Sequence, residues 1–147
     1  MATYEVFRGS YDDEVVDWLY GLPAQTELDG ILYVHGSPLS DVESFPPQPG
    51  DDDERMLAGV RDRTVVFGHS HQQFRRPGPH GTDLLNPGSV GMPLDGDRRA
   101  AWAIRDDDGD FAFRRTEYDV ERAAAAYRQM RGDFGEFAAN RIERGSD

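Results

Sequence analysis

The 147-residue chain contains no cysteine, and none of its basic residues is lysine. Without cysteine, disulfide bonds and Cys-ligated zinc or iron–sulfur centres are excluded, so a metal ion must take histidine, carboxylate or amide ligands. The apolar runs are a few residues long, far below the roughly 20 residues that a membrane-spanning helix requires. The first residues also lack the basic-then-apolar pattern of a signal peptide. We therefore expect a soluble, cytoplasmic protein.

Positive charge is scarce and is carried by arginine alone. The 16 basic residues stand against 28 acidic ones, which gives a formal net charge of −12. Because nucleic-acid affinity derives largely from Lys and Arg, we expect no binding to nucleic-acid backbones and none to anionic membranes. An acidic surface with Arg in place of Lys indicates a halophilic protein, since molar salt screens the repulsion. A GC-rich genome, whose codons favour Arg and Asp, is the alternative explanation.

The pattern of apolar residues predicts an α/β fold. Two continuous apolar runs, Ile31–Val34 and Thr64–Phe67, are typical of buried strands. An Asp- and Gly-rich turn between two further apolar segments predicts a β-hairpin. Further strands are expected at Asp83–Leu85, Ala100–Ile104 and Phe111–Arg115, and a loop at Leu39–Gly50. One helix should start at Asp12 or Asp13, a second should cover Asp52–Val60, and a third should run from Asp119 to Gly132. A frayed helical tail should follow from Phe134 to Arg144.

Three of the four histidines follow the two buried strands directly. His35 begins the motif His-Gly-Ser-Pro, and His69 and His71 lie in the motif Gly-His-Ser-His. Ligand sites in open α/β sheets gather at such strand ends. If the strand continued, the rings of His69 and His71 would share one side about 6–7 Å apart, which suits two ions about 3.5–4 Å apart. A single histidine at a strand end is more often a hydrogen-bonded surface residue than a ligand. His80, in Pro79-His80-Gly81, is expected to be a solvated loop residue.

Two further motifs follow the histidine motifs along the chain. They are Asn86-Pro87-Gly88-Ser89-Val90-Gly91 and Asp95-Gly96-Asp97-Arg98-Arg99-Ala100. In order and spacing, the four motifs resemble the C-terminal half of calcineurin-like metallophosphoesterases, in their small bacterial and archaeal phosphodiesterase branch. The resemblance covers about residues 12–122, followed by a C-terminal helical tail over 123–147. It implies the C-terminal half of a four-layer α/β/β/α sandwich.

The resemblance also implies a site. Members of this family hold two divalent metal ions, of Mn, Fe, Zn or Ni, which activate water for the hydrolysis of a phosphate ester. His35 and His69 resemble ligands of one metal ion, and His71 resembles a ligand of the other. The remaining motif residues resemble supports of the site, with Arg99 as an alternative to Arg98. These supports are Gly36, Gly68, Asn86, Gly88, Ser89 and Arg98.

The sequence departs from the family in its N-terminal motifs. It has no Asp-x-His loop, no Gly-Asp after a buried strand and no Gly-Asn-His, so we assign no catalytic residue. We interpret residues 1–147 as a single domain truncated at its N-terminus. A misassigned reading frame is favoured over a split enzyme that needs a separate N-terminal half, and over a degenerate homologue.

Whether the chain is an enzyme stays open at this point. The favoured function is a metal-dependent phosphoesterase, acting on a phosphomonoester or phosphodiester, that is inactive until its missing half is supplied. The alternative is a non-catalytic remnant that binds a metal ion or another protein. Apolar surfaces left bare by a missing half would also favour a homo-oligomer.

Overall fold

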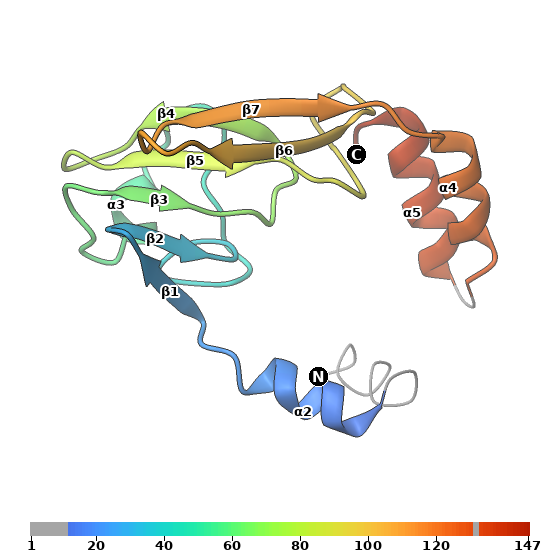
Figure 1. The fold of residues 1–147 in the computed structure, drawn as a ribbon, viewed down its shortest axis with the longest axis horizontal. Helices are drawn as coiled ribbons and strands as arrows, with labels where there is room; N and C mark the ends of the chain where they lie inside the picture. Colours follow the sequence, from blue (N-terminus) through green and yellow to red (C-terminus); the bar gives the residue numbers. More distant parts are fainter. Residues whose placement is uncertain (1–11, 131–132) are drawn as a thin grey trace.

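The structure, a computed structural model, describes residues 12–130 and 133–147. These residues form a five-stranded sheet, a separate hairpin and four helices (Figure 1). The strands are β1 (Gln25–Leu28), β2 (Ile31–Val34), β3 (Thr64–Val66), β4 (Gln73–Pro77), β5 (Asp83–Pro87), β6 (Ala100–Arg105) and β7 (Phe111–Thr116), and the helices are α2 (Asp13–Tyr20), α3 (Asp53–Met56), α4 (Val120–Arg128) and α5 (Asp133–Arg144).

The five-stranded sheet has the order β1-β2-β3-β5-β4. Its three central strands run parallel, and β1 and β4 close the sheet as antiparallel edge strands. The central strands carry the apolar runs of the sequence, as expected for strands that are covered on both faces. Because they are parallel, their C-terminal ends meet at one edge of the sheet. The two histidine motifs and the Asn-Pro-Gly-Ser motif start at this edge.

The main hydrophobic core joins the central strands to α3 and to the Pro-rich loop before it. Phe45 of this loop is fully buried, and its ring meets that of Phe67 at a centroid distance of 5.0 Å in an edge-to-face arrangement. The predicted loop therefore closes over the sheet, instead of extending into solvent. The buried members of this core are Leu32, Phe45, Met56, Leu57, Val65, Phe67 and Leu84.

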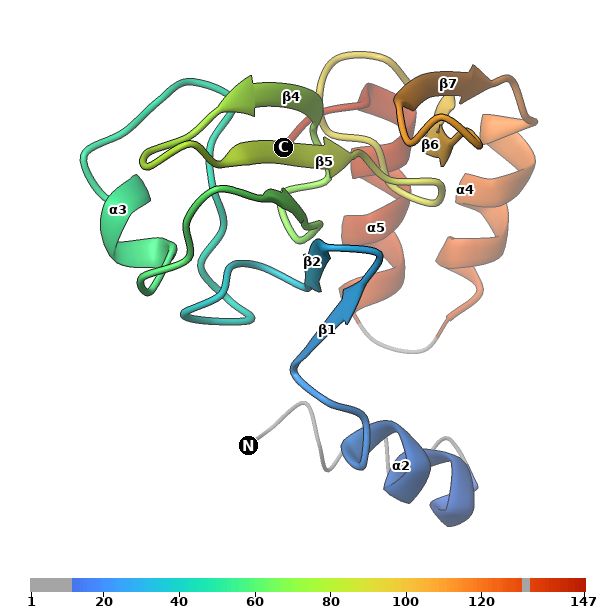
Figure 2. The same cartoon turned by 60° about the vertical axis from the view of Figure 1, so that its left-hand side comes forward.

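The hairpin β6–β7 and the pair α4–α5 complete the chain. The hairpin is a two-stranded sheet that lies beside β4 and β5 (Figures 1 and 2). The helices α4 and α5 pack against each other through Ala124, Ala139 and Ile142, which are all fully buried. The expectation of a frayed tail was wrong, because α5 places small and apolar residues on the one face that α4 covers.

The predicted helix caps are confirmed. Asp12 caps α2 by accepting a hydrogen bond from the Glu14 N–H, and Asp119 caps α4 by accepting one from the Arg122 N–H. The second helix was predicted too long, because Ala58 adopts a positive φ of 50° that ends the helical geometry before Val60. The predicted helix end at Gly132 lies outside the described residues.

Helix α2 stands apart from the sheet and is joined to β1 by a short extended segment (Figures 1 and 2). It is amphipathic, as predicted, but its large apolar side chains are exposed and only Val16 is buried. No helix in the described parts of the chain has the length and the apolar character needed to cross a bilayer.

The best-buried ion pair links α3 to the edge strand β4. The Asp53 carboxylate accepts a hydrogen bond from the Arg76 Nη2 at 3.0 Å, its other oxygen lies 2.8 Å from the Arg76 Nη1, and both side chains are buried. Replacing Asp53 by Ala leaves a buried guanidinium without its counter-charge, so we expect the free energy of unfolding in urea to fall by about 3–5 kcal/mol. Arg55→Ala, which breaks the exposed pair with Glu43, is the matched control and should cost much less, because solvent screens an exposed ion pair. Equal losses in the two variants would contradict this prediction.

Candidate functional site

Backbone hydrogen bonds hold the ends of the three parallel strands together. The Gly68 N–H donates to the His35 carbonyl at 2.8 Å, and the Phe67 N–H donates to the Leu85 carbonyl at 3.0 Å. These bonds continue the pairing of β3 with β2 and with β5 beyond Val66, the last residue of β3. The loops that carry the histidines therefore start in a fixed register.

The structure brings His35 and His69 together at this edge. The Nε2 of His35 lies 3.3 Å from the Nδ1 of His69, and the two rings are nearly perpendicular. Both side chains are exposed. In tetrahedral coordination with metal–nitrogen distances of about 2.0–2.1 Å, two ligand nitrogens lie about 3.3–3.4 Å apart. The observed distance therefore fits two ligands of one cation as well as it fits a hydrogen bond.

His71 lies close by in sequence but points elsewhere. Its Nδ1 is 2.9 Å from the Met92 carbonyl, and its own carbonyl accepts the Leu94 N–H. A carbonyl can only accept a hydrogen bond, so the proton of a neutral His71 is on Nδ1. Its Nε2 is then left with the lone pair that could bind a cation.

Strand geometry does not continue through the Gly-His-Ser-His motif, so the expectation of two rings on one side of a strand was wrong. The strand β3 ends at Val66, and His69 and His71 have φ angles of 64° and 57°. This left-handed backbone costs a non-glycine residue on the order of 1–3 kcal/mol, and such strain is found at functional sites. The turns separate the two rings and aim them at different neighbours.

Asn86, at the end of β5, connects the loops. Its side chain is fully buried, and its Nδ2 donates to the Gly68 carbonyl at 2.8 Å and to the Ser70 Oγ at 3.1 Å. Its Oδ1 accepts the Gly88 N–H at 2.9 Å. The Asn86 amide thus fixes both the Gly-His-Ser-His loop and the Asn-Pro-Gly-Ser loop. Ser89 orders the following segment, because its Oγ accepts the Met92 N–H and its carbonyl accepts the Ala101 N–H.

Two glycines of the motifs allow close approach of the backbone. A Cβ at Gly36 would lie 2.7 to 2.9 Å from the carbonyl oxygens of Glu43, Ser40 and Asp41, so no side chain fits there. Gly88 has a φ of +84°, and a Cβ would lie 2.6 Å from the Cβ of Ala101. These contacts explain why the loops need glycine at these positions.

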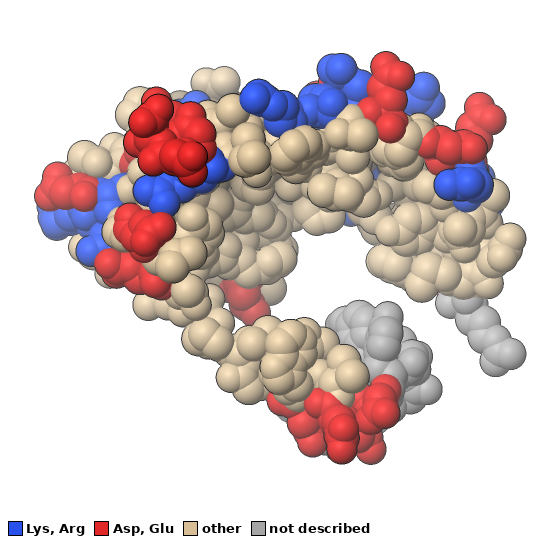
Figure 3. Space-filling model, in the orientation of Figure 1, with Lys and Arg blue, Asp and Glu red and all other residues tan. Residues whose placement is uncertain are grey.

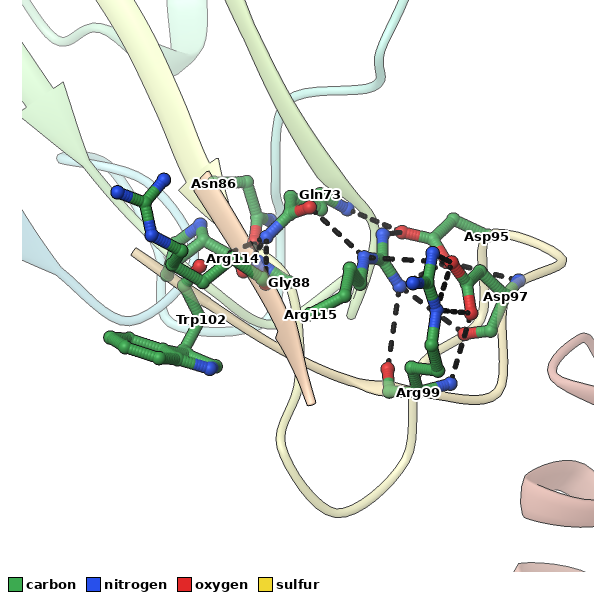
Figure 4. Close-up of polar contacts among 10 residues, drawn as sticks. Gln73, Asn86, Gly88, Asp95, Asp97, Arg99, Trp102, Arg114 and Arg115 are labelled. Atoms are coloured by element: carbon green, nitrogen blue, oxygen red, sulfur yellow. Dashed lines mark hydrogen bonds and ion pairs between the residues drawn. The ribbon is translucent and has the colours of Figure 1, made fainter. Parts of the chain in front are cut away.

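A polar network that the sequence did not reveal ties the hairpin to the histidine loop (Figure 4). Arg115 of β7 binds both oxygens of Asp95, at 2.5 and 3.1 Å, and its Nε donates to the Gln73 Oε1. Asp95 also accepts the Gln73 N–H, two residues after His71. Arg115 lies opposite Ala101, which faces inward. This pairing is known only from the structure, so the sequence alone did not mark Arg115.

Arg98 and Arg99, the two alternatives predicted to support the site, are bound by other groups. Arg98 is exposed, and its Nη1 donates to the carbonyl of Glu143 in α5 at 3.4 Å. Arg99 is bound by the Asp97 carboxylate. His80 is an exposed residue whose Nε2 lies 2.9 Å from a carboxylate oxygen of Glu54, as expected of a surface histidine.

The described residues do not assemble a complete set of metal ligands. Across 12–130 and 133–147, no group of three or more histidines, cysteines or carboxylates is placed so that it could hold an ion. What these residues present is one pair of imidazoles at a distance that fits two positions of one cation, with His71 directed to a different neighbour.

No protein-family model and no curated protein matches the sequence. Two solved structures are similar in fold. The crystal structure of a metallophosphoesterase from Sphaerobacter thermophilus has a TM-score of 0.72 at 24% identity, covering 92% of this chain and 62% of that one. A hypothetical protein from Pyrococcus horikoshii OT3 has a TM-score of 0.71 at 20% identity, covering 91% of this chain and 55% of that one. This chain thus has an α/β fold of the metallophosphoesterase type, as predicted, and spans less than two thirds of either structure.

The Asp95–Arg115 pair gives the stability a dependence on pH. Burial favours the neutral form of the Asp95 carboxyl, but hydrogen bonds from Arg115 and Gln73 outweigh it and lower its pKa from the ordinary 3.8. The stability that the Asp95 carboxylate contributes is fully present above pH 3.8, the ordinary pKa of an Asp. It is lost as the pH falls through the lowered pKa of the folded protein. We expect Asp95→Asn to cost about 1–3 kcal/mol at pH 7 and to show a smaller deficit below pH 3.8.

Urea titrations of both proteins across the acid range measure this difference. Asp108→Asn removes one negative charge from the exposed β6–β7 turn and is the matched control, for which a deficit at pH 7 is not expected. A deficit in Asp95→Asn that stays constant from pH 7 into the acid range would contradict the lowered pKa.

Proposed function

We propose that this chain supplies the histidine-bearing edge of a metal-dependent phosphoesterase, which hydrolyses a phosphomonoester or phosphodiester with two divalent metal ions. The fold supports this proposal, because it is the fold of a solved metallophosphoesterase. The observation that carries it is the 3.3 Å separation between the Nε2 of His35 and the Nδ1 of His69. Both rings are exposed at the strand edge and are therefore accessible to a phosphate ester.

In this proposal the histidines divide between two ions. His35 and His69 bind one ion through the two facing nitrogens, and His71 binds the other through its Nε2. Of the four metals that the family uses, imidazole suits Fe, Zn and Ni best, whereas Mn is a harder ion that favours oxygen ligands. When bound, two such ions polarise the phosphoryl oxygens and lower the pKa of a bound water. The Met92 carbonyl holds the proton of His71 on Nδ1, and Asn86 keeps both loops in place.

The remaining ligands come from outside the described residues. Catalytic zinc sites use three protein ligands for each ion, whereas the described part of this chain contributes a pair and a single histidine. Carboxylate or amide ligands from a separate polypeptide, equivalent to the rest of a metallophosphoesterase, would complete both ions. By itself the chain should bind a divalent ion weakly and not turn over.

The second candidate is a non-catalytic role in binding a metal ion or another protein. It is favoured by the finding that no group of three potential ligands occurs within residues 12–130 and 133–147. The phosphoesterase and a non-catalytic metal-binding protein would both bind a cation through the histidine pair, and they differ in whether catalysis appears when the missing ligands are supplied.

We expect the isolated chain to bind Co²⁺ with an absorption spectrum that depends on the histidine pair. His35→Ala and His69→Ala should each weaken binding by at least about 10-fold, because each removes one of two ligands, and altering even the groups around a site costs 10–100-fold. His80→Ala is the matched control, because His80 is an exposed histidine paired with Glu54. Titration by absorption and by calorimetry measures the affinities. Equal affinities in the wild type and His69→Ala would contradict a shared ion.

Catalysis separates the two candidates. We expect no turnover of a chromogenic phosphodiester by the chain with Mn²⁺ above the metal blank. Turnover should appear when the chain is co-expressed with the part of the Sphaerobacter thermophilus metallophosphoesterase that it does not cover, and His69→Ala should abolish it. Failure of the wild-type pair to turn over, with metal binding intact, would favour the non-catalytic role. Turnover that survives His69→Ala would contradict the proposed site.

A further inference from the structure

Two exposed apolar surfaces of this chain have no partner among the described residues. The helix stripe consists of Val15, Trp18, Leu19 and Leu22 on and just after α2. The hairpin face consists of Trp102, Ile104, Ala112 and Arg114 on β6 and β7. We propose that two copies of the chain associate by packing the helix stripe of each copy on the hairpin face of the other.

The helix stripe is built to pack against something. Its residues recur at intervals of three and four along one side of the helix, and their exposed fractions are 46% for Val15, 64% for Trp18, 52% for Leu19 and 48% for Leu22. A helix of eight residues is not stable by itself, because isolated helices shorter than about 12–15 residues are marginal in water. Helix α2 stands off the sheet on an extended connection (Figures 1 and 2), so it can reach a second copy.

The hairpin face is the bare side of a two-stranded sheet. The pairs Trp102–Arg114 and Ile104–Ala112 alternate along the hairpin with the pair Ala101–Arg115, whose alanine is buried on the opposite side. Trp102 and Ile104 are 37% and 48% exposed. A two-stranded hairpin is itself marginally stable in water, and the main sheet covers only one of its sides.

The dimensions of the two surfaces agree. From Val15 to Leu19 the helix stripe rises about 6 Å along α2, and Leu22 lies just beyond the end of the helix. Trp102 and Ile104 lie about 7 Å apart along β6, and the paired strand adds about 5 Å across the hairpin. The helix stripe therefore covers the hairpin face without leaving much of either surface exposed.

Charge favours a second copy as the occupant. Helix α2 has acidic residues in its first turn and no basic residue in its last turn. Arg114, beside Trp102, is exposed and has no carboxylate partner among the described residues. Figure 3 shows the acidic side chains gathered on α2 and arginines along the side that carries β7. Since one chain carries both surfaces, a reciprocal exchange closes as a two-fold dimer.

The net charge sets how this association responds to salt. Each copy carries −12, so two copies repel one another at long range. At about 1 M salt the Debye length is about 3 Å, against about 10 Å at 0.1 M. The apolar contact persists while this repulsion is screened, so we expect a tighter dimer at high salt.

The other exposed aromatic pair lies on α5 and provides a control. Phe134 and Phe137 lie with ring centroids 6.5 Å apart, and the Arg141 guanidinium covers the ring of Phe137 at 4.4 Å. These side chains therefore have partners within their own helix. Phe134→Ser removes an aromatic residue of similar exposure to Trp18 from outside both surfaces.

The oligomeric state of the full chain tests the proposal. By sedimentation equilibrium at about 1 M salt, where the Debye length is about 3 Å, we expect a dimer. Trp18→Ser, on the helix stripe, should weaken it at least about 10-fold, as expected for a central aromatic contact. Trp102→Ser, on the hairpin face, should weaken the dimer by a similar factor. If loss of the Trp102 hydrogen bond to Thr116 unfolds the hairpin, Ile104→Ser tests the same face. Phe134→Ser should leave the dimer unchanged.

A charge exchange identifies the two surfaces as partners. Arg114→Glu should weaken the dimer about 5-fold by placing like charges opposite each other, and adding Glu14→Arg to the same chain should restore it. A wild-type monomer throughout the concentration range at high salt would overturn the proposal. So would a dimer that Phe134→Ser disrupts, or one that resists both Trp18→Ser and the changes on the hairpin face. Circular dichroism confirms that each variant is folded.

Discussion

The arrangement of the candidate site depends on one buried amide. Asn86 lies at the end of the central strand β5 with no exposure to water, so each of its polar atoms requires a partner. Its partners are the Gly68 carbonyl, the Ser70 hydroxyl and the Gly88 N–H. Because an unpaired buried polar group costs about 1–3 kcal/mol, the two loops are held where these bonds can form. The His35–His69 contact follows, since Gly68 also donates to the His35 carbonyl.

A second constraint comes from far along the chain. Arg115 of the hairpin holds Asp95, and Asp95 holds the backbone of Gln73 next to the loop of His71. Both members of the ion pair are mostly shielded from solvent, so their charge-assisted bonds are stronger than those of surface pairs. The direction of His71 is therefore coupled to the packing of β6–β7 on the main sheet. The hairpin therefore positions the loop that carries His71.

The histidine edge suits a cation, whereas the exposed apolar surfaces suit a second copy of the chain. The ionised side chains lie mainly outside the histidine edge, and many are paired with each other across exposed surfaces. The edge itself presents two facing imidazoles, which can bind a cation. The helix stripe has acidic residues beside it, and its Leu19 and Leu22 line the same hollow as His35. The hairpin face has Arg114 beside its apolar residues, and changes on this face test the association of copies without altering the histidine pair.

Much of the fold could be predicted from local patterns. The apolar runs identified β2 and β3, the Asp-Gly turn identified the hairpin, and Asp12 and Asp119 identified two helix starts. The edge strands β1 and β4 could not be found in this way, because β1 is wholly exposed and β4 carries two arginines, so neither shows apolar alternation. The order and spacing of the motifs likewise identified the candidate histidines.

By itself, therefore, the sequence determined the α/β class, two buried strands and the placement of three histidines after them, because these follow from local periodicity. Only the tertiary structure decided that His35 and His69 meet while His71 turns to Met92. The left-handed turns at His69 and His71, and the Asn86 and Asp95 bonds, depend on partners distant in sequence. The physical reason is that a loop's conformation is set by which buried polar groups it must satisfy, and those are known only once the strands have packed.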